Sequence, residues 1–85
     1  MKHIQYIYLT MCPHCWKANR LIKKARQEFP ELQAVKIEKL NWLKHRDLSS
    51  RYGFHLVPTF IVDGEKVHEG AVDSPTIERV LRSAL

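Results

Sequence analysis

The strongest constraint on the fold of this sequence is a Cys-Pro-His-Cys motif, Cys12–Cys15, that stands between an apolar run and a long amphipathic stretch. The run Ile4–Leu9 is almost wholly apolar and rich in β-forming residues, which predicts a strand covered on both faces. Apolar residues at helical spacing follow the motif. They predict a helix that begins at Pro13 and ends before Pro30. The motif is therefore expected where a strand ends and a helix begins.

The rest of the chain predicts three more strands and two more helices. We expect strands over Leu32–Glu38, Thr59–Val62 and Glu65–His68, a helix over Trp42–Tyr52, a turn at Asp63-Gly64 and a final helix opened by Ser74-Pro75. Asn41 and Gly53 suit the start and the end of the middle helix. The order β-α-β-α-β-β-α predicts an α/β fold in which helices cover both faces of one mixed four-stranded sheet. With 85 residues, the chain is expected to form a single domain over residues 1–85.

Cysteine usage and composition narrow the function. Two cysteines are too few for the disulfide framework of a small secreted protein, so the pair indicates chemistry rather than a structural bridge. No apolar run is long enough to span a membrane, and the N-terminal stretch does not resemble an export signal. We therefore expect a cytoplasmic protein without a membrane partner. The formal net charge of +5 favours acidic partners.

Much of the positive charge falls on the predicted first helix. Five basic residues precede its first acid, Glu28: Lys17, Arg20, Lys23, Lys24 and Arg26. They indicate either a solvated face or a surface that docks acidic partners. No aromatic residues interleave with these charges, and no recognition motif is present, so nucleic acid is not an expected partner.

The position of the two cysteines predicts a division of labour between them. Cys12 is expected at the N-cap, where its sulfur would accept hydrogen bonds from the N–H of His14 or Cys15 and where the helix dipole favours the thiolate. Thiolate is the attacking species in disulfide exchange. Cys15 begins the apolar stripe of the helix, so it is expected to be shielded and close enough to attack a mixed disulfide on Cys12. Pro13 and His14 are expected to set the redox poise.

A second motif, Tyr52–Phe60 (YGFHLVPTF), completes a resemblance that runs nearly end to end. With the strand-CPHC-helix unit, it resembles the thioredoxin/glutaredoxin superfamily, which implies a thioredoxin-like fold of three layers, α/β/α. The resemblance implies that Pro58 is cis and faces the cysteines, and that Val57 offers backbone groups to a substrate chain in strand-like pairing. Thr59 would begin the following strand.

Other positions match parts of the superfamily only. Gly70, Ala71 and Asp73 stand in a segment similar to the Gly-Gly-x-Asp of glutaredoxins, which implies a role in substrate binding. Met11 occupies the place of a tryptophan that thioredoxins carry before the first cysteine, and Trp16 is expected on the substrate-facing rim. Tyr6 stands where thioredoxins carry a buried acid, and Leu9 where glutaredoxins often carry lysine. The CPHC motif itself matches a periplasmic oxidant of the superfamily.

These features predict a thiol–disulfide oxidoreductase that reduces or exchanges protein disulfides or glutathione-mixed disulfides. Cys12 would attack and Cys15 would resolve, with a reductase partner and no bound cofactor or metal, although glutathione is an expected alternative co-substrate. We expect a monomer. The rival interpretation is a small metal-binding protein of the copper-chaperone type, because those proteins also place a C-x-x-C between a first strand and a helix and thiolates suit Cu(I).

Overall fold

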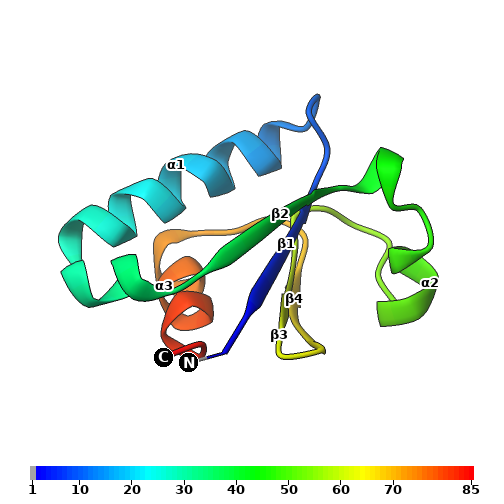
Figure 1. The fold of residues 1–85 in the computed structure, drawn as a ribbon. Coiled ribbons are helices and arrows are strands. Elements are labelled where there is room, and N and C mark those ends of the chain that lie inside the picture. The colour runs from blue at the N-terminus through cyan, green and yellow to red at the C-terminus, as the bar shows by residue number, and fades with distance from the viewer. Residues whose placement is uncertain (1) are drawn as a thin grey trace.

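The computed structural model describes residues 2–85 and arranges them as helices on both faces of a four-stranded mixed sheet (Figure 1). The strands are β1 (Ile4–Tyr8), β2 (Ile37–Asn41), β3 (Thr59–Val62) and β4 (Glu65–Glu69). The helices are α1 (Pro13–Glu28), α2 (Leu48–Tyr52) and α3 (Ser74–Arg82), with short 3₁₀ helices η1 (Pro30–Ala34) and η2 (Trp42–Lys44). The predicted element order and the mixed sheet are confirmed.

The sheet has the order β2-β1-β3-β4, so β1 is central and β2 is an edge strand. β2 runs parallel to β1, whereas β3 is antiparallel to both β1 and β4. In this register Tyr6 of β1 lies between Lys39 of β2 and Phe60 of β3. Its ring stacks on that of Phe60, with ring centroids 4.9 Å apart.

The two faces of the sheet carry separate apolar cores. Ile4, Tyr6 and Phe60 face α1 and α3, and Ile7 and Ile61 face the side of α2. Alternate residues of β1 therefore pack into different cores, as expected for a strand whose side chains point to opposite faces. This double coverage explains why the run that forms β1 is apolar almost throughout. No helix within residues 2–85 is long and apolar enough to cross a membrane.

The predicted strand over Leu32–Glu38 is wrong in its position. Its first residues form the 3₁₀ helix Pro30–Ala34, and β2 begins only at Ile37. Leu32 and Val35 are both buried. In a 3₁₀ helix, side chains three residues apart lie on the same side. Burial of both Leu32 and Val35 therefore fits a 3₁₀ turn and does not fit a strand, in which every second side chain faces the same side.

The predicted helix over Trp42–Tyr52 is interrupted. It divides into the 3₁₀ helix Trp42–Lys44 and the short helix α2, Leu48–Tyr52. Residues 43–47 are all exposed, so no apolar stripe holds a continuous helix against the sheet. The two predicted end residues are nevertheless confirmed. The side chain of Asn41 accepts a hydrogen bond from the Leu43 N–H at 2.9 Å, and Gly53 ends α2 in the left-handed conformation.

The remaining boundaries agree with the sequence interpretation. Helix α1 begins at Pro13 and ends before Pro30. Asp63 and Gly64 both have positive φ, 53° and 87°, which is the backbone of the tight hairpin turn predicted between β3 and β4. The last helix begins at Ser74, and the side chain of Asp73 caps it.

Gly53 provides a test of this chain path, because it directs the backbone from α2 toward the loop that precedes β3. Its φ is 69°, and a side chain in that region is strained. We expect Gly53→Ala to lower the free energy of unfolding in urea by about 1 kcal/mol. Gly53→Asn is the matched control and should lose less, because asparagine tolerates the left-handed conformation. An alanine variant as stable as the parent protein would contradict the assigned backbone.

Candidate dithiol site

The two cysteines lie where the sequence placed them, at the junction of β1 and α1. Cys12 is the N-cap of α1 and has an extended backbone, and its carbonyl accepts the first helical hydrogen bond from the Trp16 N–H at 3.0 Å. Both cysteines are free thiols. Cys12 is partly exposed, whereas Cys15 is fully buried. The predicted contrast between an accessible and a shielded sulfur is therefore present.

The predicted capping role of the Cys12 sulfur is wrong. The Cys12 side chain makes no hydrogen bond to the first turn of α1. Instead its thiol is directed at the carbonyl oxygen of Val57, with Sγ and O 3.9 Å apart. The thiol takes this orientation because a protonated thiol is a hydrogen-bond donor and a backbone carbonyl is a good acceptor. The contact joins the reactive sulfur to the loop before β3.

The buried cysteine is held as a thiol. Burial raises the pKa of Cys15 to about 12, because a charged sulfur would lose its hydration. A backbone hydrogen bond from Leu9 acts in the opposite direction, and the neighbouring Cys12 raises the pKa further. At neutral pH Cys15 is therefore protonated, and it must lose that proton when it attacks another sulfur.

Tyr6 supports the helical turn that carries Cys15. Its hydroxyl lies 3.0 Å from the Cys15 carbonyl oxygen and 2.9 Å from Oδ1 of Asn19, and its single proton is donated to one of these acceptors at a time. Burial, followed by the charges that Cys15 and Cys12 would carry, raises the pKa of Tyr6. The position where thioredoxins carry an acid is thus occupied by a neutral hydrogen-bond donor. Tyr6 falls within the predicted strand Ile4–Leu9, but neither polar contact of its hydroxyl was predicted.

The loop between α2 and β3 lies opposite Cys12, as the resemblance implied. The Val57–Pro58 peptide bond is cis. Pro58 is buried, and its carbonyl accepts a hydrogen bond from the Gly70 N–H at 2.9 Å. Thr59 begins β3 and is fully buried, and its hydroxyl donates to the Leu56 carbonyl. Thr59 therefore supports the loop from inside, and Gly70 is brought against it from the end of β4.

Glu69 also supports the site, although no role was predicted for it. Its carboxylate accepts hydrogen bonds from the N–H groups of His55, at 2.9 Å, and Leu56, at 3.2 Å, and pairs with the Lys66 ammonium. The ion pair with Lys66 and then the hydrogen bond from His55 lower the pKa of Glu69 to about 2. The carboxylate thus ties the loop before Val57 to β4. Its position beside Gly70 is the only signal that the sequence contained.

The predicted site residues that neighbour the two cysteines in sequence are all exposed. Met11 is 84% exposed and Trp16 is 53% exposed, so both form a rim beside Cys12. Pro13 and His14 are exposed in the first turn of α1. The Trp16 indole N–H donates to the Thr10 carbonyl at 2.7 Å, which fixes the ring at this rim.

Ala71 and Asp73 lie in the connection between β4 and α3. Ala71 is exposed, and its carbonyl lies 2.9 Å from Nε2 of His68. The Asp73 carboxylate accepts from the Thr76 N–H at 2.9 Å and caps α3, and its contacts with Thr76 lower its pKa. Asp73 thus has a structural partner within its own helix.

Metal binding has little support in the geometry. No group of three or more His, Cys, Asp and Glu side chains in the described part of the chain is arranged to hold a metal ion. The topology also differs from the βαββαβ order of copper chaperones, because η2 and α2, and not a further strand, separate β2 from β3 along the chain.

Comparisons with known proteins agree with this geometry. A family model described as a thioredoxin domain matches residues 2–82. A thioredoxin of Methanocaldococcus jannaschii is 29% identical over 82 residues, which cover 96% of this chain and 94% of that protein.

Solved structures show the same fold. A malarial protein superposes with a TM-score of 0.72 at 15% identity and covers 100% of this chain and 98% of its own. Reduced desulfothioredoxin of Desulfovibrio vulgaris Hildenborough has a TM-score of 0.71 at 22% identity, covering 96% of this chain and 80% of its own.

The contrast between the two sulfurs predicts selective alkylation. When the reduced native protein is treated with iodoacetamide at neutral pH, we expect one alkyl group per chain, on Cys12. Cys15 is fully buried and its pKa is raised to about 12, so it should not react. Peptide mass spectrometry identifies the modified residue, and both cysteines should react in denaturant. Equal labelling of the two cysteines in the native protein would disprove the assigned burial.

Glu69 predicts a specific dependence of stability on pH. Its pKa is lowered from 4.5 to about 2 in the folded protein, so its ionised form stabilises the fold above about pH 4.5, and this contribution disappears as the pH falls toward 2. We expect Glu69→Gln to unfold at lower urea concentration at pH 7, with a difference from the parent protein that shrinks over that pH range.

The matched control for this prediction is Glu65→Gln, an exposed glutamate on the same strand, which should show no such difference. A Glu69→Gln variant whose stability loss stays constant from pH 7 to pH 2 would show that the charge of Glu69 does not hold the loop.

Proposed function

This chain belongs to the thioredoxin-domain family, and from that premise we propose that it catalyses thiol–disulfide exchange and reduces disulfides of protein substrates. The observation that carries the proposal is the contrast between the two sulfurs. Cys12 is partly exposed and faces the Val57 carbonyl, whereas Cys15 is fully buried one helical turn away. An accessible attacking sulfur with a shielded sulfur behind it is the arrangement that a two-step exchange requires.

In the first step, Cys12 attacks one sulfur of the substrate disulfide as a thiolate. A bond forms between Cys12 Sγ and that sulfur, the substrate S–S bond breaks, and the second substrate sulfur leaves as a thiolate. The proximity of the Val57 carbonyl to Cys12 and the exposure of Met11 and Trp16 support contacts of these three residues with the substrate chain. Strand-like pairing with Val57 would orient the substrate through its main chain and so accept many sequences.

In the second step, Cys15 attacks Cys12 Sγ. A Cys12–Cys15 disulfide forms, the mixed disulfide breaks, and the substrate leaves fully reduced. The proton of Cys15 passes to a departing substrate thiolate, because Tyr6 is a neutral donor and cannot accept it. Cys12 releases its proton to solvent when it forms the attacking thiolate, and the second substrate thiolate takes up a proton from solvent. In total, two electrons pass from the dithiol to the substrate, and the protons of Cys12 and Cys15 balance the two that the reduced substrate gains. The thiols hold these electrons themselves, so the exchange needs no bound cofactor.

The oxidised protein then needs a reductant. We favour a dedicated reductase that attacks the Cys12–Cys15 disulfide, because the family and the similar thioredoxin of Methanocaldococcus jannaschii point in this direction. Glutathione is the alternative reductant, for which Gly70, Ala71 and Asp73 are the candidate contact residues. We propose that the protein acts as a monomer and reduces its substrates in the cytoplasm. His14 and Pro13 would set the reduction potential from their exposed positions in the first turn.

Serine substitutions test the proposed roles of the two sulfurs. In an insulin-reduction assay with dithiothreitol as reductant, Cys12→Ser should abolish catalysis, because no sulfur remains to attack. When reduced Cys15→Ser is freed of dithiothreitol and mixed with insulin without added reductant, it should accumulate a mixed disulfide between Cys12 and the substrate, visible as a covalent adduct on a non-reducing gel.

The adduct distinguishes the proposal from a general loss of folding. Circular dichroism of both variants provides the control for structure. Insulin reduction by Cys12→Ser at the rate of the parent protein, or an adduct on Cys15 rather than on Cys12, would overturn the assignment.

A further inference from the structure

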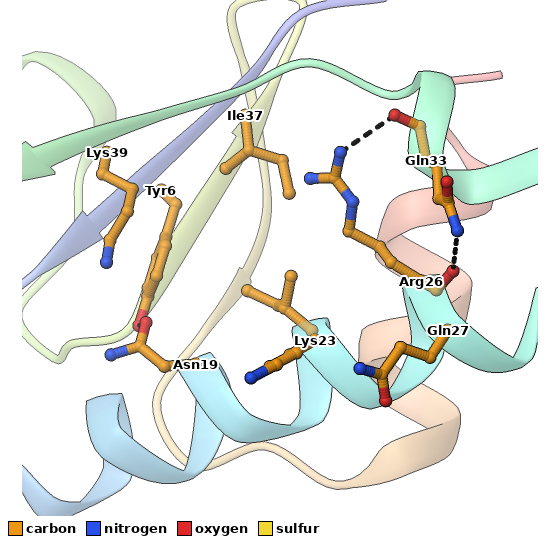
Figure 2. Close-up of a pocket in the computed structure, with 9 residues that line it drawn as sticks. Tyr6, Asn19, Lys23, Arg26, Gln27, Gln33, Ile37 and Lys39 are labelled. Atoms are coloured by element: carbon orange, nitrogen blue, oxygen red, sulfur yellow. Dashed lines mark hydrogen bonds between the residues drawn. The ribbon is translucent and has the colours of Figure 1, made fainter. Parts of the chain in front are cut away.

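A separate pocket opens between α1 and the edge strand β2 (Figure 2). Its volume is about 720 Å³, within the range of small-molecule sites, which is roughly 300–1,000 Å³. Neither cysteine lines it, and neither does the Val57–Pro58 loop, so it is distinct from the dithiol site within residues 2–85. No step of the proposed disulfide exchange involves this pocket.

The pocket is positively charged. Lys23 and Arg26 come from α1 and Lys39 comes from β2, while no carboxylate lines it in the described part of the chain. The acidic residues closest to Lys39 and Arg26 in the sequence pair with basic residues outside the pocket. Glu38 alternates to the other face of β2, where it contacts His3 at 3.0 Å, and Glu28 lies 3.9 Å from Lys24 on another side of α1. The three cations therefore have no neutralising acid in the pocket.

Part of the basic wall is held in place by neighbouring groups. The Arg26 guanidinium donates to the Gln33 carbonyl at 2.9 Å, and the Gln33 side-chain amide donates back to the Arg26 carbonyl at 3.1 Å (Figure 2). The Lys39 ammonium lies over the rings of Tyr6 and Tyr8, 5.8 Å and 5.0 Å from their centroids. A fixed guanidinium still has N–H donors left for a ligand, since it carries five.

The rest of the lining suits a ligand with a body as well as a charge. Side-chain amides of Asn19 and Gln27 offer donors and acceptors, and Ile37, with a small part of Ile22, adds apolar surface above the buried Tyr6. The pocket thus combines cations from two elements, neutral hydrogen-bonding groups and an apolar wall. Of the basic residues on α1, Lys23 and Arg26 line this pocket, whereas Lys24 does not.

We propose that this pocket binds a small organic phosphate of about the size of a nucleoside monophosphate. Guanidinium and ammonium groups are the preferred protein partners of a phosphate dianion, and the amides and apolar wall match a polar ring system. A concave site of this volume favours a small molecule over an acidic protein, which would need a broad surface. The ligand would lie beside Tyr6 without covering Cys12.

Adenosine monophosphate is the probe, added to the reduced ¹⁵N-labelled protein at physiological salt and followed by NMR. We expect saturable shifts of backbone amides around Asn19, Lys23, Arg26 and Lys39. Adenosine, which lacks the phosphate, should bind at least about tenfold more weakly, because it forms no charge-assisted hydrogen bonds. Lys39→Gln should weaken binding of the monophosphate by a similar factor.

Lys24→Gln is the matched control, because it removes the same charge from a lysine of α1 that does not line this pocket, and it should bind within about twofold of the parent protein. Equal weakening by the two substitutions, equal binding of adenosine, or the absence of saturable shifts would overturn the proposal. So would shifts at these amides with a glutamate-rich peptide but not with the monophosphate, since they would indicate a protein-docking surface. Insulin reduction by Lys39→Gln is measured separately and should be unchanged, so the outcome does not depend on the proposed exchange activity.

Discussion

The buried side chain of Tyr6 connects the central strand β1 to β3 and to the helix that carries the two cysteines. Its ring stacks on Phe60 of β3, and its hydroxyl contacts the Cys15 carbonyl and Asn19 in the first turns of α1. A buried hydroxyl must find a partner, because leaving it unpaired costs free energy. The orientation of α1 over the sheet is therefore coupled to the packing of β1 on β3. Cys12 is carried by α1, and the loop that contains Val57 leads into β3. The packing of α1, β1 and β3 therefore also sets the spacing between the reactive sulfur and the Val57 carbonyl.

The chemistry of the site follows from a contrast in solvation. Cys12 lies at the surface, whereas Cys15 is buried and retains its proton at neutral pH. The residue beneath them is a neutral tyrosine at the position where thioredoxins carry an acid, so position 6 offers no carboxylate to accept the Cys15 proton. On the other side of the sulfurs, Glu69 holds the loop that faces Cys12 through the N–H groups of His55 and Leu56.

Much of this arrangement could be predicted from the sequence, because local signals determine it. The Pro13 helix start, the Asp63-Gly64 turn and the element order depend on neighbouring residues, and all three are confirmed. Other parts depend on contacts between distant segments. The contact of Cys12 with Val57 joins residues 45 positions apart, and it replaced the local cap that the sequence favoured. Glu69 likewise acts on a loop 13 and 14 residues away. Where exposed residues separate two apolar groups, as in residues 43–47, periodicity alone overestimated the helix.

The central claim is that Cys12 and Cys15 form one exchanging pair. It is tested most directly by equilibrating the purified protein with mixtures of reduced and oxidised glutathione and measuring the mass of the acid-trapped products. The account predicts that the chain passes between the free dithiol and a monomeric form lighter by two hydrogen atoms, with a Cys12–Cys15 bond located by peptide mapping. A stable glutathione adduct on Cys12, or disulfide-linked dimers in place of the internal bond, would contradict it.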